Sequence, residues 1–365
     1  MLLENLETYN WRNINGIAVW NPDLNLIYGE NGQGKTNWLE AIYLLATTKS
    51  FRTQRLQEGV LYDNHTAFVR GTVSRNQDIH RELQVTLQGA VKTLTVNGKR
   101  ESTAAYLGQL HAYAFTANEL DTIRGTPEAR RKFLDRGVAS LHQSYVHTLA
   151  DYNRVVKQKN RLLQEKFTDT DDVLKLKQQI EVWNFQLVKL GTEIHHARVE
   201  YVEKLNEKLR RDLFGAEEYA IRYVSSLEGK GDLTDYEKLF ATRLEVRLQA
   251  EMQAGYSLIG THRDDLEITF DNRSLRIYGS SGQHRSALIL LDLAAIDVYY
   301  EWHQEYPLFV MDDVDAELDA RRLSLLLQQL EGRTQTFITT SDEELRHRFA
   351  GRGTAYKIVA GCIEL

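Results

Sequence analysis

One glycine-rich segment near the N-terminus constrains the fold of this chain more than any other feature. It fits the pattern G-x-x-x-x-G-K-[ST] and consists of Gly29, Glu30, Asn31, Gly32, Gln33, Gly34, Lys35 and Thr36. Apolar residues 24–28 before it predict a buried strand, and residues 37–45 after it predict a helix. In that setting the glycines let backbone N–H groups turn inward, and the helix N-terminus attracts anions. We therefore predict that this segment binds a nucleotide, with Lys35 reaching the β- and γ-phosphates and Thr36 offering its hydroxyl to Mg²⁺.

A second motif lies far downstream, where an apolar strand predicted over residues 306–311 ends in two carboxylates. A carboxylate at the carboxyl end of a buried parallel strand can hold Mg²⁺ directly or through water. We assign Asp312 to the metal and expect Asp313 to orient or deprotonate the attacking water. Together the two motifs predict an α/β protein that binds ATP.

A short polar run before the second motif opens an apolar helix predicted over residues 287–300. Its Ser280, Gly282 and Gln283 are expected to contact nucleotide, because the N–H groups at a helix start are free to bind a γ-phosphate. The run resembles the signature of ABC-type ATPases. In that arrangement one protomer supplies the phosphate loop and its twin supplies the signature, so a complete site requires an ATP-dependent homodimer.

Several further stretches, taken together and in order, resemble the RecF family of Rad50/SMC-like ATPases nearly from end to end. They are residues 49–52, 115–120, 125–135, 189–194, 259–266 and 312–319. The resemblance implies an ABC-type P-loop ATPase head with a mixed sheet, interrupted by a mainly helical lobe with a short helical hairpin. It also implies an ATP-driven dimer that clamps DNA at single-strand gaps and assists recombinase loading in DNA repair, replication restart and SOS induction. RecR and RecO are the implied protein partners.

Three departures from related patterns bear on the chemistry. The RecF family usually has Pro-Glu at the position of Ala117-Asn118, which leaves a nucleotide-sensing role of that segment in doubt. Most ABC ATPases place a switch histidine after a later strand, whereas here Thr340 is expected to act as a hydroxyl sensor. Asp313 is also shorter than the glutamate of transporters and SMC proteins. With Lys35, Asp313 and Thr340 as catalytic residues, we expect a weak DNA-stimulated ATPase in which slow hydrolysis resets a clamp.

The hydrophobic period changes along the chain. Residues 1–115 alternate as strands and turns, including an Asn97-Gly98 hairpin signal, and are expected to form the first part of the ATPase head. Residues 116–301 are mainly helical in period and are expected to form the lobe that carries the signature, and residues 302–365 complete the head. A helix of about 40 residues spans only about 60 Å, so the hairpin is a stub and not a long coiled coil.

Composition limits the partners and the compartment. The 365 residues carry a formal charge of −6, which at first argues against a nucleic-acid partner. Residues 121–166 nevertheless hold ten basic and five acidic side chains, and we predict DNA contacts at Arg130, Arg131, Lys132 and Arg52. The single cysteine and the lack of a signal-peptide pattern or long apolar run predict a cytoplasmic protein without membrane contact.

The residues alone leave alternatives open. A basic stretch is as often a solvated helical face as a DNA contact, and Arg52 and Arg55 could face DNA, nucleotide or neither. Residues 262–265 could be a structural ion-pair cluster or a functional site, and the family resemblance adds weight to function. An ATP-gated protein scaffold with indirect DNA contact is the first rival function. An ABC transporter ATPase subunit is the second.

Overall fold

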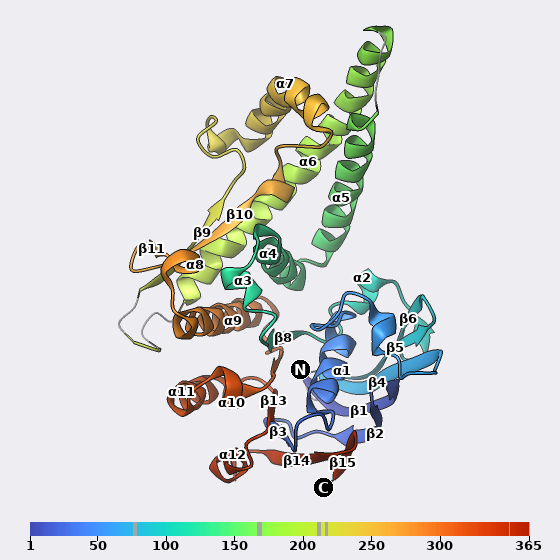
Figure 1. The fold of residues 1–365 in the computed structure, drawn as a ribbon, viewed down its shortest axis with the longest axis vertical. Helices are drawn as coiled ribbons and strands as arrows, with labels where there is room; N and C mark the ends of the chain where they lie inside the picture. The colour runs from blue at the N-terminus through green and yellow to red at the C-terminus, as the bar shows by residue number, and fades with distance from the viewer. Residues whose placement is uncertain (76–78, 166–169, 210–212, 216–217, 350, 365) are drawn as a thin grey trace. The chain divides into compact units, whose positions relative to one another are not determined.

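The chain folds into two compact units, described here from a computed structural model (Figure 1). The first unit holds Met1–Arg124, Lys208–Glu218 and Gly279–Leu365, and the second holds Gly125–Glu207 and Tyr219–Tyr278. The structure describes residues 1–75, 79–165, 170–209, 213–215, 218–349 and 351–364.

The first unit is built on two six-stranded sheets. One is antiparallel in the order β2-β1-β4-β5-β6-β7, and its strands are β1 (Leu2–Trp11), β2 (Ile14–Val19), β4 (Thr66–Arg75), β5 (Ile79–Gln88), β6 (Val91–Val96) and β7 (Lys99–Arg100). The other has the order β15-β14-β3-β13-β12-β8, and its strands are β3 (Leu24–Tyr28), β8 (Ala112–Phe115), β12 (Leu308–Met311), β13 (Thr336–Thr340), β14 (Thr354–Val359) and β15 (Cys362–Glu364). Its pairs are parallel except β14–β15, so the predicted mixed α/β head is confirmed.

Helix α1 (Lys35–Thr47) is buried between these two sheets, which fixes the loop that precedes it. It contacts β1, β4 and β5 of the antiparallel sheet and β8, β12 and β13 of the parallel sheet. Residues 38–46 are all buried, as expected for a helix that is apolar on nearly every side. Further helices of this unit are α2 (Thr103–Tyr106), α3 (Asp121–Arg124), α9 (Ser281–His303), α10 (Val314–Glu317), α11 (Ala320–Leu330) and α12 (Glu344–Arg348), with the 3₁₀ turn η1 (Leu56–Gly59).

The second unit is the expected helical lobe. Its elements are α4 (Pro127–Leu141), α5 (Gln143–Leu163), α6 (Thr170–Lys208), β9 (Tyr219–Val224), η2 (Leu233–Asp235), α7 (Tyr236–Ala254), η3 (Thr261–Arg263), β10 (Asp265–Phe270), β11 (Arg273–Ser274) and α8 (Leu275–Tyr278). Helices α5 and α6 form the predicted short hairpin, because Leu163 packs with Leu176 and Ile180 while Thr148 Oγ1 lies 3.4 Å from Glu193 Oε2. Within the described part of the chain, no helix is both long and apolar enough to cross a membrane.

The signature helix belongs to a different unit from the one expected. The helical period predicts a lobe over residues 116–301, whereas residues 116–124, 208–218 and 279–301 are part of the first unit. The physical reason is packing: α9 is buried over most of its length and contacts β8 and α3. Periodicity identified the helix but carried no information about which core it joins.

Candidate nucleotide-binding site

The predicted strand–loop–helix context of the glycine-rich segment is present. The loop leaves β3, turns through Gly29, Gly32 and Gly34 with φ of 147°, 80° and 108°, and enters α1. Residues with a Cβ atom rarely adopt these positive φ values, which explains why glycine occupies the three positions. A Cβ on Gly29 would also lie 2.6 Å from the Ile358 carbonyl oxygen of β14. The loop is therefore shaped for a backbone that must curl tightly against its own sheet.

Lys35 occupies the centre of this loop. Its Nζ donates to the carbonyl oxygens of Gly29 at 2.8 Å and Glu30 at 3.0 Å, and it lies 3.5 Å from Asn31 Oδ1. Only 5% of the residue is exposed. A buried ammonium must be paired, and here the loop carbonyls supply the partners that phosphate oxygens would supply when a nucleotide is bound.

Asp312 connects the end of strand β12 to the phosphate loop. Its Oδ1 accepts hydrogen bonds from Thr36 Oγ1 at 2.9 Å and from Thr339 Oγ1 at 2.7 Å. The three residues meet because β3, β13 and β12 are adjacent parallel strands whose carboxyl ends share one edge. Burial raises the pKa of Asp312, although the two hydroxyl donors lower it. A carboxylate and a hydroxyl are ligands that Mg²⁺ prefers, so Thr36 and Asp312 fit this ion.

The hydroxyl that contacts Asp312 comes from Thr339, whereas the sequence analysis selected Thr340. Side chains alternate along a strand, so adjacent threonines of β13 cannot share one direction. Thr339 Oγ1 also accepts from the Asp313 N–H at 2.8 Å, while Thr340 Oγ1 accepts from the Asp342 N–H at 3.0 Å. The hydroxyl at the proposed metal ligand is therefore that of Thr339, and the sensor role of Thr340 stays a prediction. The alternation was the signal that could have separated the two.

Asp313 has the backbone geometry of a special position. It adopts a left-handed conformation, φ 49°, directly after β12 and before α10. Its side chain is exposed, unlike the partly buried Asp312 beside it. Non-glycine residues in this conformation are uncommon and cluster at functional sites. The geometry leaves the carboxylate accessible for the water-orienting role expected of it.

The signature residues form a helix cap. Ser280 Oγ accepts from the Gln283 N–H at 3.2 Å, and Gln283 Oε1 accepts from the Ser280 N–H at 2.7 Å. This reciprocal pair is a capping box at the start of α9. A Cβ on Gly282 would lie 3.4 Å from Arg322 Nη1, so the guanidinium of α11 lies beside the cap. Both the side-chain carbonyl and the backbone N–H of Gln283 are used within this cap, and a nucleotide contact of Gln283 stays a prediction.

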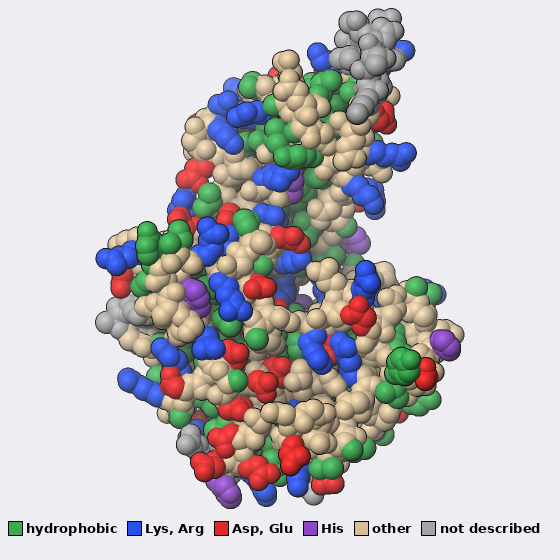
Figure 2. All heavy atoms as spheres, viewed as in Figure 1, with side chains coloured by type: hydrophobic (Ala, Val, Ile, Leu, Met, Phe, Trp, Pro, Cys, Tyr) green, Lys and Arg blue, Asp and Glu red, His purple; other side chains and the backbone are tan. Residues whose placement is uncertain are grey.

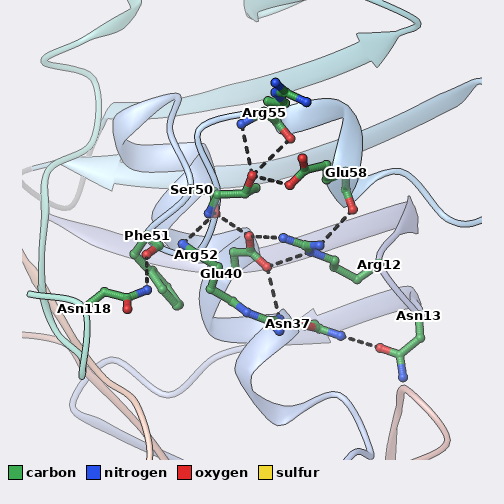
Figure 3. Close-up of polar contacts among 11 residues, drawn as sticks. Arg12, Asn13, Asn37, Glu40, Ser50, Phe51, Arg52, Arg55, Glu58 and Asn118 are labelled. Carbon is green, nitrogen blue, oxygen red and sulfur yellow. Dashed lines mark hydrogen bonds and ion pairs between the residues drawn. The ribbon is translucent and has the colours of Figure 1, made fainter.

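A buried carboxylate organises the segment that follows α1 (Figure 3). Glu40, fully buried, accepts two hydrogen bonds from Arg12, at 3.0 and 2.9 Å, and one from Ser50 Oγ at 2.5 Å. Arg52 Nη1 donates to Asn37 Oδ1 at 2.6 Å and lies 3.7 Å from Glu40. The positive charge of Arg52 acts on the pKa of Asp312 in the opposite direction to burial, which raises it. Arg52 is thus directed to the first turn of the phosphate-loop helix, which favours a nucleotide role over the predicted DNA contact.

Asn118 stands in the segment where the family usually has Pro-Glu. Its Nδ2 donates to the Phe51 carbonyl at 2.9 Å, which ties this segment to the loop carrying Arg52 (Figure 3). Arg55 is exposed, and its backbone N–H donates to Thr53 Oγ1 at 3.0 Å. A positioning role for Asn118 therefore has a structural basis, even though the usual residues are replaced.

The basic residues predicted to contact DNA differ sharply in exposure. Arg130 is buried and forms a bidentate pair with Asp265, with N–O distances of 2.6 and 2.9 Å. Arg131 is half-buried, donates to a backbone carbonyl at 2.7 Å, and has its pKa lowered by burial. Lys132 is exposed and pairs with Glu128 at 2.7 Å. The prediction for Arg130 is wrong, because a guanidinium held by a carboxylate in the lobe interior cannot reach a phosphate.

His262 and Asp264 form part of the polar core of the lobe, whereas Arg263 between them is exposed. Asp264 is fully buried and accepts from the Ser226 N–H at 2.6 Å and from the Tyr223 hydroxyl. His262 Nδ1 lies 2.8 Å from the Tyr152 hydroxyl. These contacts satisfy buried polar groups, which is the structural interpretation that the sequence left open.

The fold and this site define an ABC-type P-loop ATPase head with a helical insertion. The protein-family model described as "RecF/RecN/SMC N terminal domain" matches residues 2–359. A "DNA replication and repair protein RecF" from Bacillus cytotoxicus is 31% identical over 100% of this chain and 98% of its own. The protein of the same description from Ligilactobacillus salivarius is 34% identical over 93% of this chain and 91% of its own. The chain belongs to the RecF family, as the sequence motifs predicted.

Solved structures agree with this assignment. The structure described as "the recombination mediator protein RecF-ATP in RecFOR pathway" has a TM-score of 0.88 and 29% identity, and covers 100% of this chain and 97% of that one. The Smc head domain from Pyrococcus yayanosii has a TM-score of 0.55 at 13% identity, covering 100% and 96%. The second similarity concerns the fold alone.

Proposed function

We propose that this chain is an ATP-gated DNA-binding protein of recombinational repair, whose ATP site is completed by a second copy. The observation that carries the proposal is the Asp312 cluster, in which Thr36 of the phosphate loop and Thr339 of β13 bond to one carboxylate oxygen. This joins the phosphate-binding and metal-binding halves of an ATPase site in one protomer. The ATP-bound RecF structure of a 29% identical relative supports the same ligand here.

Nucleotide binding changes the partners of Lys35. Its ammonium leaves the Gly29 and Glu30 carbonyls and pairs with β- and γ-phosphate oxygens. Thr36 and Asp312 would hold Mg²⁺, which neutralises phosphate charge when it is bound. Asp313 is the group that orients the attacking water, and Thr339 holds its backbone in place. A short carboxylate in this role is consistent with slow hydrolysis that serves as a switch.

The second copy supplies the start of α9. Ser280 and Gln283 cap each other there and fix the start of the helix, while their own backbone N–H groups are used within the cap. The helix N-terminus still attracts an incoming γ-phosphate. Arg322 lies beside Gly282 at the same end of the helix and pairs with Asp319 at 2.9 Å. ATP therefore links two heads, and the dimer is the form that holds DNA at single-strand gaps and assists recombinase loading together with RecR- and RecO-like proteins.

A second candidate function is favoured by one observation. Arg130 and Arg131 are held by contacts within the lobe, which removes two of the cations expected to contact DNA. An ATP-gated scaffold that acts mainly through protein partners would not need them. The two functions differ in whether the purified protein alone binds DNA when ATP is present.

Fluorescence anisotropy of labelled duplex and gapped DNA at fixed salt tests the proposal. The protein is titrated without nucleotide, with ADP, with ATP and with a slowly hydrolysed ATP analogue. Tighter binding with ATP or the analogue is the expected result. Binding that is absent or independent of nucleotide would favour the scaffold, and hydrolysis at hundreds per second would contradict the switch.

A further inference from the structure

We propose that the helical lobe carries a subsite for an unpaired DNA nucleotide, formed by Tyr256, Arg263 and the polar face of α5. The inference rests on the proposed function and specifies which part of a gapped DNA the lobe contacts. It is carried by three observations within the second unit: an exposed aromatic–cation pair, hydrogen bonds that tie its loop to buried residues, and an adjoining hollow whose described lining includes two cations.

The aromatic–cation pair is placed where solvent can reach it. Tyr256 is 44% exposed, and the guanidinium carbon of Arg263 lies 5.0 Å from the centroid of its ring. Arg263 is also exposed. In proteins that bind single-stranded nucleic acid, the bases stack on aromatic rings and on guanidinium planes. Stacking tolerates any base sequence because every base has a π face.

The pair is anchored to the buried interior of the lobe. Arg263 Nη2 donates to the Ser257 carbonyl at 2.9 Å, and the Ser257 N–H donates to Asn160 Oδ1 of α5 at 2.7 Å. Beneath the loop, Ser257 Oγ donates to Glu251 Oε1 at 3.0 Å, and Glu251 pairs with Lys159 at 2.6 Å with both side chains fully buried. The hydrogen bonds of Ser257 to Asn160 and Glu251 therefore tie the residue next to Tyr256 to the lobe interior. A preorganised platform loses little entropy on binding.

A hollow of about 580 Å³ on α5 adjoins this platform. Its described lining residues include amides and two cations and no carboxylate, and they are Asn153, Val156, Lys157, Gln158, Asn160, Arg161 and Gln164. Asn160 belongs to both features, and a Cβ on Gly255 would lie 3.8 Å from Gln164 Cγ. Figure 2 shows Lys and Arg side chains gathered over α5 and α7 on the visible face of this unit. Lys157 and Arg161 are four residues apart on the helix and project from one face.

The combination fits single-stranded DNA better than duplex. Lys157 and Arg161 are suited to successive phosphates, and amides suit the edges of exposed bases. Duplex DNA offers phosphates but hides the faces of its bases in the stack, so it would use the cations and leave Tyr256 without a role. An unpaired nucleotide next to a duplex end uses both. The lobe would thereby distinguish a gap from an intact duplex.

The test compares Tyr256→Ala with Tyr256→Phe in the full-length protein, using the ATP analogue and three DNAs: an intact duplex, a duplex with an oligo(dT) gap, and free oligo(dT). Tyr256→Ala should weaken binding to the gapped and single-stranded DNAs roughly 5- to 100-fold, while duplex binding changes little. Tyr256→Phe keeps the ring and should retain most of the affinity. Phe185→Ala is the matched control, because Phe185 is 75% exposed on α6 of the same unit and should have no effect.

A crosslinking measurement gives a second, independent result. Gapped DNA with 5-iodouracil in the gap is irradiated with the protein, and the crosslinked peptide is identified by mass spectrometry. A crosslink at Tyr256 supports the subsite. Equal losses of duplex and gapped binding in Tyr256→Ala, no loss at all, or crosslinks confined to other regions would overturn it. If the wild-type protein binds no DNA with ATP, the proposed function itself fails; if it binds duplex normally and Tyr256 is neutral, only the subsite fails.

Discussion

At the scale of single residues, Lys35 is the side chain on which nucleotide binding depends most directly. It is buried, and its donors face loop carbonyls that phosphate oxygens would replace. We expect Lys35→Ala to weaken ATP binding by about 100-fold or more, since each charge-assisted hydrogen bond is worth about 1.5–3 kcal/mol. Titration with a fluorescent ATP analogue measures this. An affinity within about threefold of wild type, in a variant with an unchanged circular dichroism spectrum, would remove Lys35 from the site.

His195 makes the stability of the lobe depend on pH. Burial lowers the pKa of His195 to about 4, with the charges of His196 and Arg198 acting in the same direction, and its ring stacks on Tyr236 at 3.7 Å. Between pH 6.5 and 4 the unfolded chain binds the proton and the folded chain does not, so stability falls as pH falls through this window. The lost free energy of unfolding for this group is about 3 kcal/mol.

His195→Phe is the matched variant for this pH dependence. It keeps a ring against Tyr236 and removes only the titrating group, whose Nδ1 has no hydrogen-bond partner in the described structure. Urea denaturation at pH 7.5, 6, 5 and 4.5 should show a shallower loss of stability for the variant than for wild type. Parallel curves for the two proteins would mean that His195 does not carry the effect.

Among single residues, motif positions were predictable from the sequence, but side-chain directions and burial were not. The phosphate loop, Thr36 and Asp312 were predicted correctly as neighbours because their motif fixes their relation to strand ends. Thr339 was missed because the choice between adjacent threonines depends on which face of β13 meets β12. The DNA contact predicted for Arg130 was wrong because the sequence of a basic cluster does not say which of its side chains are buried. Arg130 is buried and bonds to Asp265.

At the scale of elements, α1 and the segment that follows it form one unit around Glu40. We expect Glu40→Gln to destabilise the protein by about 3 kcal/mol, because an amide nitrogen would face the Arg12 donors inside the core. The same change should weaken ATP binding, since Ser50 and Arg52 are held near the phosphate-loop helix by this carboxylate. Urea denaturation and nucleotide titration measure the two effects.

Glu7→Gln is the control for this carboxylate. Glu7 also pairs with an arginine, Arg70, but both side chains are partly exposed, at 28% and 39%. A pair at such a surface is worth no more than about 1 kcal/mol, and it lies on the antiparallel sheet, away from the loop. Similar losses in the two variants would mean that burial of Glu40 is not what matters.

Element types were predictable where local chemistry decides them. The Asn97-Gly98 turn has positive φ at both residues, 50° and 74°, as that pair predicts for a hairpin. The α5–α6 hairpin followed from its period. The assignment of α9 to a unit did not follow, because a long apolar stretch in a helix fits any core, and only its packing on β8 and α3 decides.

At the scale of the whole molecule, the nucleotide site lies in the first unit and the proposed DNA subsite in the second. Helix α6 runs from the lobe to Lys208, which pairs with Glu301 near the end of α9. The start of α9 carries the signature cap. Helix α9 thus has the proposed γ-phosphate contact at its start and the ion pair with the end of α6 near its other end. We expect dimer closure to affect DNA binding through this helix.

The split site itself makes a prediction that only a dimer can satisfy. Ser280→Arg removes the cap and places a long side chain where the partner's nucleotide would dock, at a cost in stability of about 1 kcal/mol for the lost cap. Alone, this variant should bind ATP as a monomer and fail to associate, and Lys35→Ala should fail for lack of nucleotide. A mixed dimer of the two has one site with both defects and one site with an intact phosphate loop and an intact signature.

Mixing the two variants therefore discriminates between a shared site and a self-contained one. Energy transfer between differently labelled protomers, measured with the ATP analogue, should appear in the equimolar mixture at concentrations where neither variant associates by itself. A site contained in one protomer would leave every molecule defective, and the mixture would behave as the sum of its parts. Recovery of association, with hydrolysis at no more than about half the wild-type rate because one of two sites is intact, is the outcome expected of the proposed split site.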